Sequence, residues 1–142
     1  MLGAGILQPV AVLAAWTIIM LVWMYVARVP AMAQVTLSPE ELSRLTAAKM
    51  DELLPPHVQW KAHNYNHLHE APTVFYAVAV TLAIIGEGDG LNAQLAWVYV
   101  VLRVIHSIIQ ATINKVQLRF LVFALSSFCL MALVARAALV MF

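Results

Sequence analysis

The chain has 142 residues, of which 63% are apolar and 11% are charged, and its formal net charge is +1. A soluble domain is about 45–50% apolar and about 25% charged, so this composition excludes an ordinary soluble protein and a disordered one. Eight basic residues against seven acidic ones leave no basic surplus, so we expect no nucleic-acid partner. The length suits one domain, and the composition predicts an integral membrane protein that contacts the lipid bilayer.

Four apolar stretches are candidates for membrane-spanning helices, because about 20 apolar residues are needed to cross the hydrocarbon core. We expect these spans at about residues 9–29, 71–86, 91–114 and 118–141. The first contains no charge before Arg28, and a Gly-Glu-Gly-Asp-Gly turn separates the second from the third. The sequence therefore predicts an all-α, four-helix transmembrane bundle that forms a single domain over residues 1–142.

The segment between the first two spans begins with a helix-start signal. Ser38 can cap a helix, Pro39 suits its first position, and Glu41 completes a capping box three residues after the cap. We expect a short amphipathic helix from there to about Leu54, where two consecutive prolines end it. This helix would lie on the membrane surface or pack over the bundle.

Basic residues occur in two of the three predicted loops. The first loop contains Arg44, Lys49 and Lys61, and the third contains Lys115 and Arg119, whereas the glycine-rich second loop contains none. Because cytoplasmic loops are enriched in Lys and Arg, we expect the first and third loops in the cytoplasm. Both termini then lie on the non-cytoplasmic side, and the lack of a retention signal favours a bacterial inner membrane.

Polar residues of the third span follow a helical spacing. Arg103, His106, Gln110, Asn114 and Gln117 are separated by three, four, four and three residues, which places all five on one helical face. Such groups can bond neighbouring helices and specify packing. Intramembrane ionisable groups also mark functional sites. Because this set includes an arginine, we predict a polar cavity in the cytoplasmic half of the bundle.

A second polar concentration, residues 60–70, precedes the second span. If this segment is helical, His63, His67 and Glu70 share one face with a spacing that suits a divalent metal. Di-iron membrane oxygenases carry several histidine clusters, and this chain has one, so we predict no metal site. A metal-dependent membrane enzyme is kept as an alternative.

The order of these features resembles that of the membrane-associated proteins in eicosanoid and glutathione metabolism, the MAPEG family. The resemblance covers nearly the whole chain, and its most specific part is Arg103-x-x-His106 followed by Arg119. It is closest to the branch of microsomal glutathione transferases and prostaglandin E synthase, in which these positions bind glutathione. The family's second signature, Arg-Ala-x-x-Asn-x-x-Glu-x-x-Pro-x-Phe, is approximated by Lys61-Ala62, Asn66, His69-Glu70, Pro72 and Phe75.

The resemblance implies a homotrimer that binds glutathione, as co-substrate, between neighbouring subunits and reacts it with a lipophilic electrophile or peroxide. The implied binding residues are Lys61, Asn66, His69, Glu70, Arg103, His106 and Gln110. Their cations would pair with the two carboxylates of glutathione, the glutamate with its ammonium, and the amide and imidazole groups with its peptide bonds. Arg119 is the implied catalytic residue, because a nearby cation lowers the thiol pKa from about 8.5 and creates a nucleophile.

Several positions depart from the family's pattern. The second signature fits in two registers, one of which replaces its glutamate by His69 and the other its asparagine by His67. Phe120 and Phe123 stand where several catalytic members have serine and tyrosine. A non-catalytic scaffold of the same fold that binds lipids or thiols is therefore an alternative. A small four-span transporter is a second alternative, although such exporters carry an acidic residue in the first span, which this span lacks.

Overall fold

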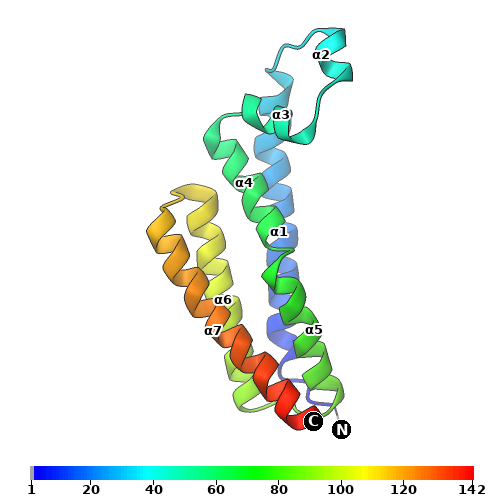
Figure 1. The fold of residues 1–142 in the computed structure, drawn as a ribbon, viewed down its shortest axis with the longest axis vertical. Helices are drawn as coiled ribbons and strands as arrows, with labels where there is room; N and C mark the ends of the chain where they lie inside the picture. Colours follow the sequence, from blue (N-terminus) through cyan, green and yellow to red (C-terminus); the bar gives the residue numbers. More distant parts are fainter. Residues whose placement is uncertain (1) are drawn as a thin grey trace.

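The computed structural model describes residues 2–142, and nearly all of this range is helical. Its seven helices are α1 (Leu7–Ala33), α2 (Pro39–Ser43), α3 (Ala47–Leu53), α4 (Pro56–His67), α5 (Ala71–Ile84), α6 (Leu91–Thr112) and α7 (Val116–Met141). No strand occurs in the described residues, which confirms the predicted all-α class. Figure 1 shows an elongated bundle with both chain ends at one end and α2 at the opposite end.

Three helices are long and apolar enough to cross a membrane, namely α1, α6 and α7. They correspond to the first, third and fourth predicted spans. α1 continues to Ala33, and Pro30 lies within its last turns. α6 ends at Thr112, two residues before the predicted bound, since Asn114 has a φ of 47° and this left-handed conformation terminates helices.

The second predicted span is shorter than a membrane crossing. α5 has 14 residues, which gives a length of about 21 Å at about 1.5 Å per residue, against a hydrocarbon core of about 30 Å. α4 precedes it, and Figure 1 shows the two helices in succession alongside α1. Pro72 lies in the first turn of α5 and could not continue a helix from α4, because it lacks an N–H and clashes with the preceding turn. Only α4 and α5 together have the length of a span.

The loop between α1 and α4 contains two short helices instead of the one predicted. The predicted start is confirmed, because Ser38 Oγ accepts from Glu41 N at 3.2 Å and Ser38 N donates to the Glu41 carboxylate at 2.9 Å. The hydrogen bond from the Ser38 backbone N–H holds the pKa of the Glu41 carboxyl below its usual range. The expectation of one continuous helix is wrong, because extended Thr46 caps a second helix by accepting from Lys49 N.

The start of α1 is held against the loop between α5 and α6. Gly3 N donates to Ala83 O at 2.9 Å, and Ile6 N donates to Gly88 O at 2.8 Å. A Cβ atom on Gly88 would lie 2.0 Å from Gly3 O, so this close approach of two backbones requires glycine. The contact joins the ends of α1, α5 and α6 at the end of the bundle where the termini lie.

One hydrophobic core runs through the bundle and positions α6 against its neighbours. The core is built by buried residues of α1, α5, α6 and α7 together with their junctions, among them Ile6, Leu13, Met20, Leu68, Phe75, Leu82, Tyr99, Val100 and Leu133. Close packing of these side chains makes the main favourable contribution to the free energy of folding within the helix bundle. The polar face of α6 is thereby held between α4 and α7.

Candidate polar cavity between helices α4, α6 and α7

Three of the five polar residues predicted for one face of the third span lie on α6. Arg103, His106 and Gln110 are buried, with exposed fractions of 1%, 2% and 8%. Asn114 lies in the turn after α6, and Gln117 is exposed in the first turn of α7. The predicted face therefore ends at Gln110, because the helix itself ends before the last two positions.

Arg103 is the largest fully buried side chain of the protein in the described residues. Its Nε, Nη1 and Nη2 atoms all lack a hydrogen-bond partner there. Its Cζ atom lies 5.6 Å from the centroid of the Phe123 ring. A guanidinium is permanently charged and carries five N–H donors, and a buried charge is strongly unfavourable unless it is paired. The position is therefore suited to an anionic group that these residues do not supply.

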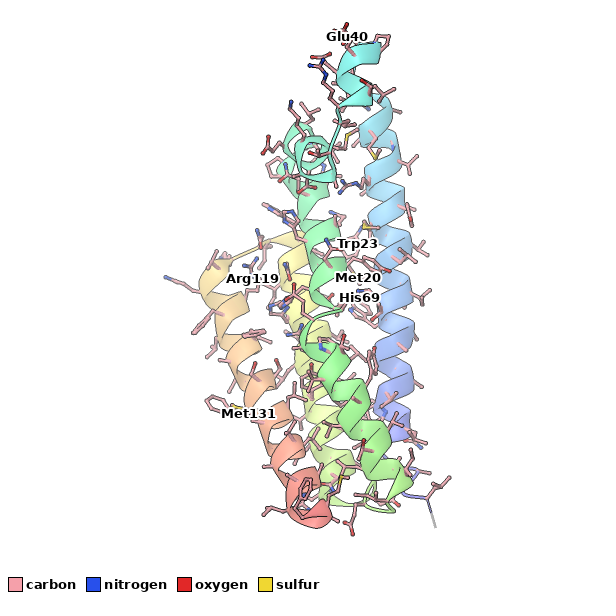
Figure 2. The ribbon with its side chains drawn as sticks, turned by 45° about the vertical axis from the view of Figure 1, so that its right-hand side comes forward. Met20, Trp23, Glu40, His69, Arg119 and Met131 are labelled. Atoms are coloured by element: carbon pink, nitrogen blue, oxygen red, sulfur yellow. The ribbon has the colours of Figure 1, made fainter. Side chains whose placement is uncertain are left out.

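A cavity of about 230 Å³ lies beside the residues next to this arginine: Arg103 itself does not line it, but Phe123, whose ring the guanidinium approaches, does. It is lined by residues of α4, α6 and α7, namely His67, His106, Gln110, Val116, Arg119, Phe120 and Phe123. Gln110 Oε1 is buried without a partner in the described residues. Arg119 Nη1 donates to Asn114 Oδ1 at 2.5 Å, and Figure 2 shows Arg119 on α7 close to the turn from α6. The cavity combines a cation, an amide and two imidazoles with aromatic walls.

His67 lines this cavity, and its imidazole is hydrogen-bonded to the carboxylate of Glu70. Its Nδ1 atom lies 2.8 Å from Glu70 Oε2, and its ring centroid lies 5.0 Å from that of His106 and 5.6 Å from that of Phe123. From the sequence, His67 was a candidate metal ligand and, in one register of the family's second signature, the replacement of its asparagine. The His-x-x-Glu spacing at the end of α4 was the signal that could have indicated the pair, since residues three apart are neighbours on a helix.

A second polar group that the sequence analysis missed ties three helices together. Asn64 Nδ2 donates to Ser107 Oγ at 2.7 Å, and Trp16 Nε1 donates to the same oxygen at 3.0 Å. Asn64 is fully buried, whereas the predicted ligand Asn66 is exposed. This network fixes the rotation of α4 relative to α1 and α6.

The ammonium of Lys61 makes its contacts outside the cavity lined by Arg119. Its Nζ atom donates to His57 O at 2.8 Å and to Ala111 O at 3.4 Å. The same ammonium lies 5.1 Å from the centroid of the Trp23 ring, within range of a cation–π interaction. Lys61 thus bonds a carbonyl in the last turn of α6, a position where a cation stabilises the helix.

Asn66 and His69 also lie outside the cavity lined by Arg119. Asn66 lines a separate groove of about 440 Å³ together with Arg28. His69 is exposed, and its Nδ1 atom donates to Tyr65 O at 2.9 Å. Within one copy of the chain, five of the predicted residues therefore lie near this cavity, namely Arg103, His106, Gln110, Arg119 and Glu70, the last through its bond to His67. The other three do not, namely Lys61, Asn66 and His69.

The two histidines that the sequence offered as metal ligands, His63 and His67, bond different carboxylates. His63 Nε2 lies 2.6 Å from Asp51 Oδ2, and Asp51 also pairs with Arg28 at 3.1 Å. His67 instead bonds Glu70. Within residues 2–142, no three His, Cys, Asp or Glu side chains gather closely enough to hold a metal ion.

Comparison with protein families gives a match to the MAPEG family over residues 6–139. Comparisons with curated proteins and with solved structures give no match. The family match covers almost the whole chain and agrees with the three apolar helices of spanning length. The chain is therefore an integral membrane protein that belongs to the MAPEG family.

Proposed function

We propose that this protein binds glutathione in the cavity beside Arg103 and transfers it to lipophilic electrophiles, or uses it to reduce lipophilic peroxides. The observation that carries the proposal is the buried guanidinium of Arg103, whose three nitrogens lack partners in the described residues. Glutathione has two carboxylates that could pair with it. The MAPEG family includes glutathione transferases and related enzymes, and this membership supports the choice of that anion.

The cavity residues match the other groups of glutathione. A carboxylate would take charge-assisted hydrogen bonds from Arg103, and a peptide N–H of glutathione would donate to Gln110 Oε1. Glu70 bonds His67 with one carboxylate oxygen, and its other oxygen could accept the ammonium. The guanidinium of Arg119 would stabilise the thiolate, which attacks the electrophile.

We further propose that the protein is a homotrimer with the glutathione site between subunits. Support comes from Lys61, Asn66 and His69, which lie outside the Arg119 cavity of their own chain. The outward groove at Asn66 could face the cavity of a neighbouring copy. Chemical crosslinking in mild detergent should give a trimer. A strictly monomeric protein that binds glutathione would contradict a site between subunits.

The proposed orientation in the membrane rests on the charge distribution of the loops. We propose a bacterial inner membrane, with the first and third loops in the cytoplasm and both termini outside it. The proximity of the chain ends in Figure 1 supports their placement on one side of the membrane. The four-span topology requires α4 and α5 to act together as the second crossing.

Calorimetry of glutathione binding to detergent-purified protein tests the function. Arg103→Ala should weaken binding by about 10- to 100-fold, because hydrogen bonds to charged groups contribute about 1.5–3 kcal/mol each. Arg44→Ala is the matched control, since Arg44 is an exposed arginine after α2 and its loss should leave binding unchanged. Absence of binding by the unmodified protein at millimolar glutathione, or equal binding by both variants, would refute the proposal.

A non-catalytic scaffold that binds lipids or thiols is the second candidate. The observation that favours it is the cavity lining, in which Phe120 and Phe123 supply aromatic walls and no lining residue carries a hydroxyl. A hydroxyl at either position would have donated a hydrogen bond to a thiolate. Glutathione binding without turnover of any lipophilic electrophile or peroxide would favour this candidate over the enzyme.

A further inference from the structure

The thiol proton of a bound glutathione needs an acceptor, and few cavity residues can accept one. Among the lining residues, Arg119 is a permanent cation, Gln110 carries a neutral amide, and the remaining side chains other than the histidines are apolar. Only the imidazoles of His67 and His106 have a nitrogen lone pair that can accept a proton.

The two imidazoles differ in what holds them. His67 Nδ1 lies 2.8 Å from Glu70 Oε2, and a carboxylate there keeps the proton on Nδ1 and leaves the lone pair on Nε2. His106 has no bonded carboxylate among the described residues and follows the buried Arg103 by one turn. Arg103 and Arg119 face both imidazoles, but only His67 has a bonded carboxylate that would stabilise its positive charge. His67 is therefore the better proton acceptor of the two.

We propose that His67, oriented by Glu70, accepts the thiol proton of bound glutathione. The inference rests on the proposed function. His67 is half-buried and lines the cavity together with Arg119, so the acceptor and the thiolate-stabilising cation border the same space. The arrangement follows the logic of a nucleophile, a base and a third group that orients the base.

The proton and the electron pairs balance in a substitution on an aryl halide. The S–H proton passes to His67 Nε2, and Glu70 stabilises the resulting imidazolium. The thiolate forms an S–C bond, the C–Cl bond breaks, and chloride leaves with its electron pair. His67 then returns the proton to water. The charged groups that face His67 are Glu70 at the start of α5, Arg103 on α6 and Arg119 on α7, with His106 on α6 as the other titratable neighbour.

Three variants of the full chain test the inference, with chlorodinitrobenzene as the electrophile. His67→Gln should keep glutathione binding and lower kcat/KM at neutral pH by about 100-fold, the usual contribution of a general base. The rate of this variant should recover as the pH rises through the ordinary pKa of a thiol, about 8.5. Glu70→Gln should cause a smaller loss, and added imidazole should partly restore activity to His67→Ala.

His63→Gln is the matched control. His63 is also a histidine of α4 bonded to a carboxylate, that of Asp51, but it does not line the cavity. An unchanged pH profile in His67→Gln, or an equal loss in His63→Gln, would overturn the inference.

The proposed function and this inference fail separately. If the unmodified protein does not bind glutathione, the proposed function fails. If the protein binds glutathione without turnover, the ultraviolet absorbance of the bound thiolate is followed against pH instead. His67→Gln should then shift ionisation of the bound thiol to higher pH, and an identical titration curve would refute the role of His67 alone.

Discussion

Replacement of Arg103 by methionine is expected to stabilise the protein in the absence of ligand and to weaken its binding of glutathione. The guanidinium is 1% exposed and its three nitrogens have no partner in the described residues, so the folded state bears an uncompensated desolvation cost. Methionine has a similar length, fills the space flexibly and carries no charge. The substitution removes the cost without opening the cavity that alanine would leave.

The magnitude follows from what is removed. Replacing buried charged groups by well-packed apolar ones can raise the free energy of unfolding by about 1–4 kcal/mol. The substitution also removes the contact between the guanidinium and the Phe123 ring, and a cation–π contact contributes about 0.5–1 kcal/mol. We therefore expect a net gain in the free energy of unfolding in the lower part of the range, about 1–2 kcal/mol. The loss of a charge-assisted bond should weaken glutathione binding at least about tenfold.

Thermal unfolding in detergent, followed by circular dichroism with and without glutathione, checks both effects. Without ligand, Arg103→Met should melt at a higher temperature than the unmodified protein. With glutathione at about 100 times its Kd, the unmodified protein should gain about 2.7 kcal/mol, and a variant that binds tenfold more weakly should gain only about 1.4 kcal/mol. Added glutathione should therefore narrow the gap between the two melting temperatures by the equivalent of about 1.3 kcal/mol or more.

Arg136 provides the matched control for this experiment. Its Nε atom donates to the buried side chain of Asn92, so Arg136→Met breaks an existing hydrogen bond and should lower the melting temperature. If Arg103→Met is also less stable than the unmodified protein without ligand, the guanidinium has a stabilising partner and the reasoning is refuted.

Three further outcomes are expected. Reporter domains fused after Lys115 should report the cytoplasm and those fused after Gly88 the opposite side; a cytoplasmic signal at Gly88 would contradict the four-span topology. Gly88→Ala should lower the free energy of unfolding by about 1–3 kcal/mol, measured by chemical unfolding, because its Cβ would collide with Gly3 O at 2.0 Å. Asn114→Gly preserves a left-handed turn but removes the hydrogen-bond acceptor of Arg119. The turnover rate should therefore fall while the thermal melting temperature changes little. Asn114→Asp keeps an acceptor and should retain more activity.

Helix positions were predictable where the signal is local. Long apolar runs identified α1, α6 and α7, because spanning length and composition are properties of a single segment. The start of α2 was equally local, since Ser38 and Glu41 make the predicted capping box. The break at Thr46 was missed because threonine is compatible with a helix interior and with a cap, and its local hydrogen bond decides between them.

The burial of Arg103, His106 and Gln110 was also predictable from their spacing. Residues three and four apart share a face of a helix, and an amphipathic helix turns its polar face inward in a membrane. The extension to Asn114 failed because a helix end depends on backbone conformation, here a φ of 47°, which periodicity does not report.

The partners of the polar residues on α4 were decided by tertiary structure. His63 and His67 share a face of that helix, yet one bonds Asp51 of α3 and the other Glu70. Asn64 and not Asn66 is buried, because Ser107 accepts its hydrogen bond.

The sequence by itself therefore determined the all-α class, the presence of three helices long enough to cross a membrane and the inward face of α6, since each depends on composition or spacing within one segment. Only the tertiary structure decided that His67 borders the same cavity as Arg119 and that Arg103 has no partner in the described residues. The physical reason is that α4 carries polar residues on more than one face, so spacing alone does not say which face is turned inward. Its rotation is set by hydrogen bonds and packing against α1 and α6, which form only when distant segments meet.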